Sequence, residues 1–492
     1  MDVNYEMTLF ADTLKRYLED KKTTIYNISK ISGVNRTMLQ RMKSAERFPK
    51  DEETVQALAN AMRLNPAESN ELIRAYRITK MGEENYLRRE HVKNIVSGFF
   101  DTTLVSEMLI QSNTHQGLKL ANNIEVISGQ ANVHRLLKAV LEIEANKKTG
   151  HIRILIQPEF AYLFECLASI DFNKNQTTVE IIITFDKNEE YGSTSYNLNI
   201  LKELVPCLFQ CDTLLPYYVY DNVNSIYNKT SFMPYKIITS DYSLFISYDQ
   251  NEAMISASSQ MLALANDNFN KKLHTAKPIF HAYHPDPQKY LEASLLGEDE
   301  LNTNQNYGLM YQPCFPSFCP DDILIDRLNK ELLPIEMMEH IVAYFGKIRD
   351  TSNFYQSFTL EGLRLFMDTG KVTEIPDFMY TYLTERQRIT LLRNIVASTD
   401  KGAFHPRIIK SELFTVPLPI DIVSPTEQTV YIYYFSQTKG IYVFHLHELG
   451  LVHAFHDFLE YLTGSELVYS ADETKKLLHQ VLEEYEAKFL GK

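Results

Sequence analysis

Residues 24–43, which read TIYNISKISGVNRTMLQRMK, decide the organisation of the amino-terminal part of the chain. Apolar residues recur at helical spacing on both sides of Gly33, which predicts two short helices joined by a tight turn. Thr24 can cap the first helix, and Gly33 can adopt the positive φ that ends it. We expect the buried stripe of this first helix to consist of Ile25, Ile28 and Ile31.

The second helix is expected to follow the cap residue Asn35 and to run from Arg36 to about Ser44. One of its faces is apolar and would pack on the core through Met38, Leu39 and Met42. Its other side chains are of the types that read base edges or contact phosphates in DNA: Arg36, Thr37, Gln40, Arg41 and Lys43.

Similar spacing predicts further helices at residues 8–19, at 52–62 and from Pro66 onward. Residues 1–80 carry 14 Lys and Arg against 11 Asp and Glu, a net charge of +3, whereas the rest of the chain carries −17. From Lys21 to Arg47 there are seven basic residues and a single acid, Glu46. A locally basic domain of this kind can face DNA although the whole chain has a charge of −14.

These residues, followed by Pro49 and the pair at 58–59, resemble the phage repressor/Cro-like (XRE-type) family of helix-turn-helix transcriptional regulators. The resemblance covers about 75 of the 492 residues, at the amino terminus. It implies that the helix after Asn35 lies in the major groove, where Arg36, Thr37 and Gln40 read bases. It also implies that Thr24, Arg41 and Lys43 contact the DNA backbone. The chain departs from the family at Ile25 and Ser29, where Gln and a small Ala are usual.

Beyond residue 115, helices alternate with short apolar segments such as 152–156 and 179–183, which predicts an α/β region with a buried sheet. The expected fold is therefore multidomain: an all-α helix-turn-helix domain followed by a large α/β region made of two related lobes. The expected parts are a DNA-binding domain at 1–78, a helical connector at 79–115, a first α/β lobe at 116–277, an inter-lobe connection at 278–345, and a second, shorter α/β lobe with a carboxy-terminal helix at 346–492.

The two lobes are expected to be related because segments of the two halves echo each other. The paired segments are 116–120 with 361–365, 136–140 with 391–395, 244–248 with 430–434, and 267–273 with 456–462, and Gly150 precedes a β segment as Gly402 does. Chance similarity between α/β patterns is the alternative. Two such lobes would enclose a cleft suited to a ligand. The last helix follows a capping box at 470–473, and its apolar stripe can dock on its own lobe or on a second subunit.

The sequence lacks the usual catalytic and phosphate-binding motifs: it has no Gly-x-Gly-x-x-Gly, P-loop, Gly-x-Ser-x-Gly or His-Glu-x-x-His. The best metal candidates are His445, His447, His453, His456 and Asp457, of which the last three share a helical face at i, i+3 and i+4. An ordinary solvated face explains them equally well. We therefore expect no catalytic residues, no metal and no cofactor.

Five cysteines in 492 residues are too few for a disulfide framework, which favours a reducing compartment. No apolar run approaches the roughly 18–20 residues that cross a bilayer, and the first residues are acidic. We expect a cytoplasmic, bacterial protein with no membrane partner and no export signal.

The composition, the motif and the resemblance together predict a one-component transcriptional regulator of the repressor type, not an enzyme. Its partners would be double-stranded operator DNA, a second copy in a homodimer, and a small-molecule or protein effector sensed by the lobes. One alternative is an enzyme or defence effector that carries the helix-turn-helix domain for DNA targeting or autoregulation. Another is an interaction scaffold.

Overall fold

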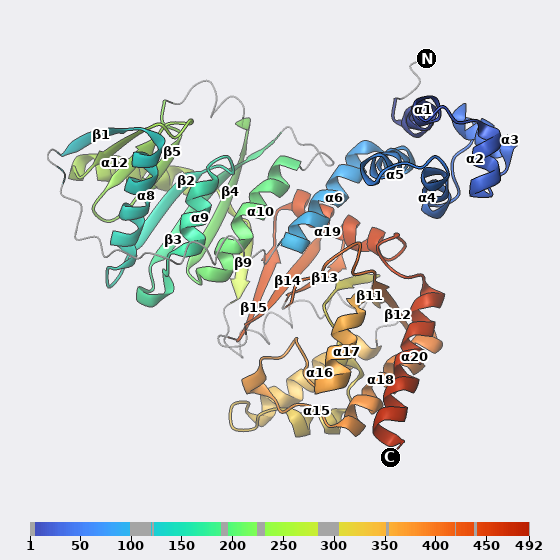
Figure 1. Ribbon diagram of the computed structural model, residues 1–492. Helices are drawn as coiled ribbons and strands as arrows, with labels where there is room; N and C mark the ends of the chain where they lie inside the picture. Colours follow the sequence, from blue (N-terminus) through green and yellow to red (C-terminus); the bar gives the residue numbers. More distant parts are fainter. Residues whose placement is uncertain are drawn as a thin grey trace. The chain divides into compact units, whose positions relative to one another are not determined.

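The computed structural model describes residues 5–98, 120, 123–187, 195–223, 232–283, 305–350, 354–418, 420–436 and 440–491. The chain divides into two compact units, one ending at His91 and the other beginning at Val92. In Figure 1 the first unit is drawn in blue and the second in the colours from blue-green to red.

The first unit is helical throughout its described part, as predicted. Its helices are α1 (Tyr5–Asp20), α2 (Ile25–Ser32), α3 (Arg36–Lys43), α4 (Glu52–Ala61), α5 (Pro66–Met81) and the first half of α6 (Glu83–Gly98). Their apolar stripes meet in one core that contains Leu14, Leu39 and Leu58. Phe48 stacks on Tyr76 with ring centroids 4.9 Å apart, which fixes the loop after α3 against α5.

One expected core residue lies at the surface. Ile28 is buried and Ile25 is half-buried, but Ile31 is 64% exposed, so the prediction of a three-residue stripe on α2 is wrong. The eight-residue helix contacts the core over little more than one turn, and Ile31 lies beyond that contact.

The second unit contains an eight-stranded and a seven-stranded sheet. The first sheet, with its helices, is here called the first lobe. Its strands are β1 (Ile124–Ser128), β2 (His151–Ile156), β3 (Thr178–Asp186), β4 (Leu214–Asp221), β5 (Tyr235–Ile238), β6 (Ser243–Ile246), β7 (Glu252–Ser256) and β8 (Lys277–Pro278). Their order is β1-β7-β6-β5-β2-β3-β4-β8, and only the β2–β3 and β3–β4 pairs are parallel among them.

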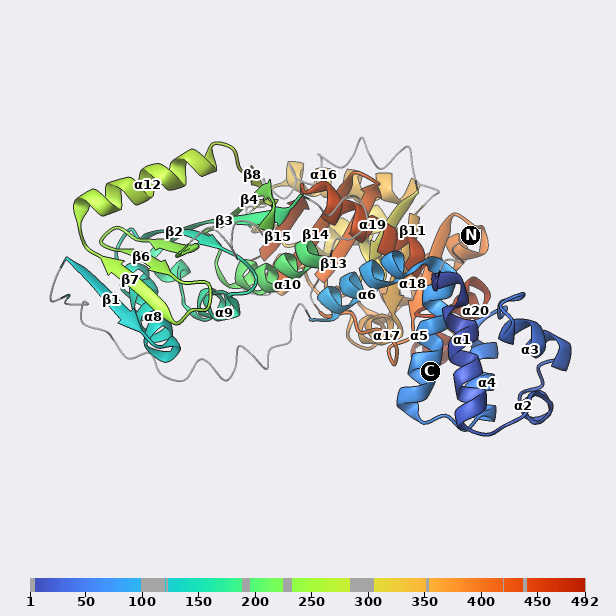
Figure 2. The same cartoon turned by 90° about the horizontal axis from the view of Figure 1, so that it is seen from above.

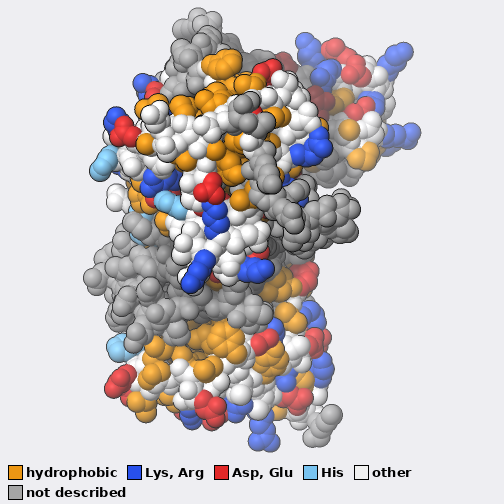
Figure 3. Space-filling view, turned by 90° about the vertical axis from the view of Figure 1, so that its left-hand side faces the viewer, with side chains coloured by type: hydrophobic (Ala, Val, Ile, Leu, Met, Phe, Trp, Pro, Cys, Tyr) orange, Lys and Arg blue, Asp and Glu red, His pale blue; other side chains and the backbone are white. Residues whose placement is uncertain are grey.

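Helices cover both faces of this sheet. They are α8 (Gln130–Ala145), α9 (Ala161–Ser169), α10 (Ser195–Gln210) and α12 (Ser259–Leu273). Figure 2 shows α8 and α9 on one side of the strands and α12 on the other. At the β1 edge Ile124 and Val126 are exposed. Figure 3 looks at the molecule from the left-hand side of Figure 1, where this edge lies, and shows hydrophobic side chains gathered there.

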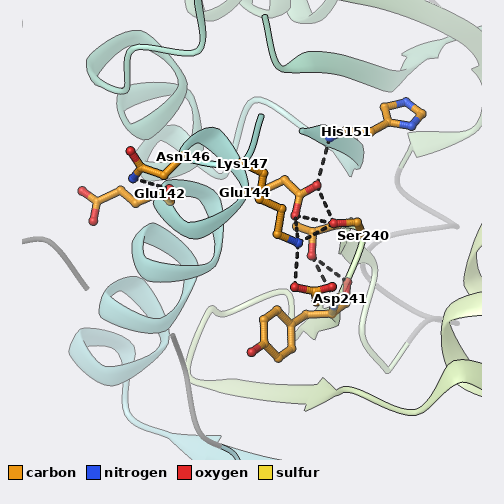
Figure 4. Close-up of polar contacts among 9 residues, drawn as sticks. Glu142, Glu144, Asn146, Lys147, His151, Ser240 and Asp241 are labelled. Atoms are coloured by element: carbon orange, nitrogen blue, oxygen red, sulfur yellow. Dashed lines mark hydrogen bonds and ion pairs between the residues drawn. The ribbon is translucent and has the colours of Figure 1, made fainter. Parts of the chain in front are cut away.

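A buried carboxylate fastens three elements of the first lobe together (Figure 4). Glu144, in the last turn of α8, accepts the main-chain N–H of His151 at 3.0 Å and the hydroxyl of Ser240 at 2.8 Å. Lys147 pairs with Glu144 at 2.8 Å and with Asp241 at 2.6 Å. The contacts join α8, the start of β2 and the β5–β6 turn, and they give this buried charge a structural role.

The second lobe is built on the seven-stranded sheet. Its strands are β9 (Phe280–Tyr283), β10 (Asn306–Leu309), β11 (Phe354–Thr359), β12 (Phe404–Ile409), β13 (Ile420–Thr426), β14 (Thr429–Ser436) and β15 (Gly440–Leu446), in the order β12-β11-β10-β13-β14-β15-β9. Its helices are α14 (Phe315–Phe318), α15 (Asp321–Arg327), α16 (Ile335–Asp350), α17 (Leu360–Thr369), α18 (Glu385–Asp400), α19 (Leu449–Leu462) and α20 (Ala471–Leu490).

The two sheets share one strand order. From β1 to β4 the first sheet has the order β1-β7-β6-β5-β2-β3-β4, and from β9 to β12 the second sheet has the order β9-β15-β14-β13-β10-β11-β12. Each strand of the first series corresponds to the strand at the same place in the second. The two parallel pairs of each sheet, β2–β3 with β3–β4 and β10–β11 with β11–β12, also correspond. Of the predicted echoes, 244–248 and 430–434 fall on the corresponding strands β6 and β14, and 267–273 and 456–462 on the corresponding helices α12 and α19. The residue pairs 136–140 with 391–395 and Gly150 with Gly402 do not correspond, because they adjoin different strands of the order. Residues 116–119 lie outside the described part.

Residues 278–345 do more than connect the lobes. They supply β9, β10 and α14 to α16, and both strands are hydrogen-bonded members of the second sheet. In the expected connector at 79–115, the described part is helical, and Val92, Ile95 and Val96 are buried in the core of the second unit. Phe99, Phe100 and Leu104 lie outside the described residues.

The last helix docks on its own lobe. The predicted capping box is present, with Ser470 and Glu473 exchanging hydrogen bonds, and Leu478, Val481 and Tyr485 are buried. Arg364 on α17 pairs with Glu484 at 3.0 Å, and Lys488 pairs with Asp368 at 2.9 Å. The stripe of α20 is thus used within the chain.

Candidate nucleic-acid interface

The turn between α2 and α3 is held by serine hydroxyls and a glycine. Gly33 has φ +76° and its N–H donates to the carbonyl of Ser29 at 3.1 Å. The Ser29 hydroxyl in turn donates to the carbonyl of Val34 at 2.7 Å. In the helix-turn-helix family that the sequence resembles, a small residue is usual at the place of Ser29. The Ser29 side chain is accommodated here because its hydroxyl forms a hydrogen bond with the main chain of the turn. These bonds fix the angle at which α3 leaves α2.

The two predicted caps are in place. The hydroxyl of Thr24 accepts the N–H of Asn27 at 3.3 Å, and the amide oxygen of Asn35 accepts the N–H of Thr37 at 2.8 Å. Both cap residues are exposed. The remaining donors at the start of each helix therefore face solvent, where a phosphate can accept them.

The polar side chains of α3 lie on the solvent-facing side of the helix. Leu39 and Met42 are buried and Met38 is half-buried, which fixes the rotation of the helix about its axis. As a result Arg36, Thr37, Gln40 and Arg41 are exposed, and Lys43 is half-buried. The structure thus brings the predicted DNA-reading residues onto one short helix, with Thr24 at the start of the helix before it.

Three acids of the first unit neutralise bases outside this pair of helices. Arg16 pairs with Glu71 at 2.6 Å, Lys21 with Glu68 at 2.7 Å, and Arg77 with Glu52 at 2.9 Å. The hydrogen bond from Arg16 lowers the pKa of the Glu71 carboxyl, and the bond from Lys21 lowers that of Glu68. In the described part of the chain, six bases between residues 22 and 47 make no ion pair: Lys22, Lys30, Arg36, Arg41, Lys43 and Arg47.

Two large side chains beside these bases are exposed, Tyr26 and Ile31, of which Ile31 was expected in the core. Tyr26 is 61% exposed on the first turn of α2, and Ile31 is exposed on its last. A tyrosine next to a basic patch can stack or bond to a phosphate. The family resemblance implies a phosphate contact at the start of this helix, residues 24–26, and Tyr26 belongs to that segment.

The residues singled out as metal candidates do not form one group, although the rings of His445 and His447 lie with centroids 4.2 Å apart. His445 stacks on Tyr431 in the sheet, with ring centroids 4.7 Å apart, whereas His453 is exposed on α19. His456 is buried beneath the same helix and is only 7% exposed, so the expected solvated face does not include it. In the described residues no group of three or more His, Cys, Asp or Glu side chains is arranged for a metal ion.

A hollow of about 560 Å³ opens beside His456 in the second lobe. It lies between β10, the β13–β14 turn and α19, and is lined by Gln305, Tyr307, Thr426, Glu427, Gln428, Thr429, His456 and Glu460. This hollow therefore lies within the second lobe and not in the cleft that was expected between the two lobes. Among its lining residues is His456, which the sequence had suggested as a metal candidate.

No protein-family model and no curated protein matches the chain. Among solved structures, TrmBL2, an archaeal chromatin protein described as having a novel mode of DNA binding, is 13% identical over 54% of this chain and 98% of its own, with a TM-score of 0.22. Phosphatidylserine synthase from Haemophilus influenzae Rd KW20 is 10% identical over 79% of this chain and 99% of its own, also with a TM-score of 0.22. TM-scores this low do not show a common fold, and neither protein supports a conclusion about the function of this chain. Among the described helices, none is both long enough and apolar enough to cross a membrane.

Proposed function

We propose that the first unit is a helix-turn-helix domain that binds double-stranded DNA in a sequence-specific way, and that the protein is a transcriptional regulator. The observation that carries the proposal is the exposed face of α3, where Gln40 is exposed and Arg36 and Arg41 make no ion pair among the described residues. Arg and Gln are the residues that bond guanine and adenine edges in the major groove.

The distribution of charge supports the same reading. Affinity for DNA comes largely from Lys and Arg that release counterions from phosphates, and bases already paired with acids contribute less to that release. The ion pairs of the first unit engage Arg16, Lys21 and Arg77 and leave the α2–α3 region positive. The acids of the remaining chain, with a net charge of −17 beyond residue 80, would be repelled by DNA, so we assign contact to this region alone.

The roles proposed for individual residues follow their positions. Arg36, Thr37 and Gln40, on the amino-terminal part of α3, would read bases, whereas Arg41, Lys43 and Thr24 would contact the backbone. Asn35 caps α3 through its side chain and would set the position of that helix in the groove. We further propose a homodimer, in which the lobes receive a signal and change the placement of the two DNA-binding domains.

Selection from a pool of 30-base-pair duplexes with random centres tests this function without knowledge of the operator. Repeated binding to the full chain should enrich one motif, and a homodimer should enrich an inverted repeat with half-sites about 10 base pairs apart. The Arg36→Ala/Gln40→Ala chain should enrich no such motif. Failure of the wild-type chain to enrich any sequence would overturn the proposal and favour an enzyme or a scaffold.

A further inference from the structure

We propose that the hollow beside α19 is a binding site for a small organic cation, of the protonated-amine class, in the second lobe. The proposal names the class of ligand that the second lobe would bind, and so it adds to the proposed function of a regulator. Its existence does not depend on DNA binding, however, because the residues that form it belong to the second lobe alone.

The hollow presents hydrogen-bond acceptors and negative charge. Two carboxylates line it, Glu427 on the β13–β14 turn and Glu460 on α19, and no Lys or Arg is among its lining residues. In the described part of the chain neither carboxylate makes an ion pair. Among the described residues, the only side chain within hydrogen-bonding distance of either carboxylate is Tyr307, whose hydroxyl lies 3.4 Å from Glu460. Two unneutralised carboxylates favour a cationic occupant.

A buried histidine aimed into the hollow adds an independent sign of a ligand. His456 is more than nine-tenths buried, and its Nδ1 lies 2.9 Å from the hydroxyl of the fully buried Ser424. That hydroxyl donates its one proton to the carbonyl of Thr426 or Thr429, at 2.9 and 3.0 Å. Nδ1 must therefore carry the proton that bonds Ser424, which leaves Nε2 as an acceptor.

Nε2 of His456 has no hydrogen-bond partner among the described residues. Since Nδ1 faces the buried Ser424, the opposite edge of the ring faces the hollow that His456 lines. Burial lowers the pKa of this imidazole, which keeps it neutral and accepting at pH 7. An acceptor without a protein partner that opens onto a hollow can take a hydrogen bond from a donor on a ligand.

Tyr307 is a largely buried member of the lining. Its ring packs edge-on against His456, with centroids 5.5 Å apart, and its hydroxyl donates to Gln305 at 2.7 Å. Burial, with the Glu460 carboxylate beside it, raises the pKa of Tyr307 to about 12, so the phenol stays neutral. An aromatic face next to carboxylates is the surface on which organic ammonium ions bind.

The size of the hollow selects an organic cation over a bare metal ion. A volume of about 560 Å³ falls within the usual range for small-molecule sites, roughly 300–1,000 Å³, and far exceeds one ion. The side chains also lack the arrangement for a metal in the described residues. The occupant we commit to is an alkyl ammonium with several N–H donors.

Calorimetric titration of the full chain, without DNA, tests the site with 1,4-diaminobutane as the probe and 1,4-butanediol as its uncharged match. We expect the diamine to bind with a Kd below about 1 mM and the diol not to bind. Glu460→Gln and Glu427→Gln should each weaken diamine binding at least about fivefold. Glu412→Gln, an exposed carboxylate on a turn elsewhere in the lobe, should leave it unchanged.

No heat from the diamine at 10 mM would overturn the proposal, and so would equal binding of the diol. Unchanged affinity in both glutamine variants would overturn it too, because the binding would then lie elsewhere. Saturable binding of Zn²⁺ in place of the diamine, lost in Glu460→Gln, would also contradict it. Because DNA is absent from every titration, failure here leaves the DNA-binding proposal standing, and the reverse holds.

Discussion

Gln157 and Gln312 hold corresponding positions in the two lobes, shortly after β2 and β10, and each clamps the main chain of a neighbouring segment. Gln157 accepts the N–H of Thr184 at 2.8 Å and donates to its carbonyl at 2.9 Å. Gln312 accepts the N–H of Thr373 at 2.9 Å and donates to the carbonyl of Lys371 at 3.1 Å. Both glutamines are fully buried.

The first prediction concerns these clamps. Gln157→Ala and Gln312→Ala should each lower the free energy of unfolding by about 2–4 kcal/mol, because each leaves a buried main-chain N–H and C=O unpaired. Gln480→Ala, at an exposed position on α20, is the control and should change it by less than about 0.5 kcal/mol. Urea unfolding followed by circular dichroism measures all three, and a control-sized effect at both clamps would contradict the interpretation.

Alanine substitutions at two glycines compare the cost of backbone strain alone with the cost of strain and a steric clash together. Gly370 and Gly402 both have positive φ, +76° and +68°. A Cβ at Gly370 would lie 2.2 Å from the carbonyl oxygen of Leu383, whereas nothing lies within 4 Å of one at Gly402. Gly402→Ala should therefore cost about 1 kcal/mol from strain alone. Gly370→Ala should cost at least about 2 kcal/mol more. Thermal melts compare the two, and equal losses would mean that the α17–α18 loop moves freely.

A buried pair of carboxyl groups should make the second lobe less stable as pH rises. Burial raises the pKa of both Glu374 and Asp421 well above their ordinary range, and the charge of Asp421 adds to the rise at Glu374. The folded state then holds protons that the unfolded state releases above about pH 4.5, the ordinary value for Glu. Stability conferred by these protons is complete below that pH and is lost as pH rises toward the raised pKa.

Glu374→Gln keeps the shape of the side chain and removes the titration. It should abolish one proton's share of the pH dependence, up to about 1.4 kcal/mol per pH unit, and so should gain stability over the wild type between pH 5 and pH 8. Urea midpoints at each pH measure the difference between the two chains. A constant difference across that range would show that Glu374 does not hold a proton in the folded state.

Local patterns predicted the first unit well. The cap at Asn35, the left-handed Gly33 and the buried Leu39 all follow from short-range rules, and the structure confirms them. Ile31 escaped prediction because helical spacing cannot tell where a short helix leaves the core. Exposure of the DNA-reading side chains followed from the same spacing, but whether they bind DNA stays a prediction.

The lobes were harder to predict because their order depends on contacts distant in sequence. β9 and β10 are four residues each and lie in or beside a segment rich in proline, and they become strands only by pairing, β9 with β15 and β10 with β11 and β13. The sequence carries a better marker of the relation between the lobes in the repeated Gln-Pro-x-Phe at 157–160 and 312–315, whereas apolar echoes arise in any α/β pattern. His456 shows the same limit: its partner Ser424 lies 32 residues away, so its burial could not be foreseen.

The central claim is tested most directly by a salt titration of DNA binding with the full chain. The probe is duplex DNA from upstream of the chain's own gene, with a scrambled duplex beside it, and the variants are Arg36→Ala/Gln40→Ala and Arg74→Ala. Arg74 is exposed on α5 close to Glu71, and its loss changes charge away from α3.

We predict tight binding that prefers the native duplex and weakens with salt. The logarithm of the binding constant should fall against the logarithm of the salt concentration with a slope of about 0.9 per phosphate contact. The preference should vanish in Arg36→Ala/Gln40→Ala, a loss of about 1–3 kcal/mol for each base contact, and should survive in Arg74→Ala. Equal, weak binding of every duplex, or full preference in the double variant, would contradict the account.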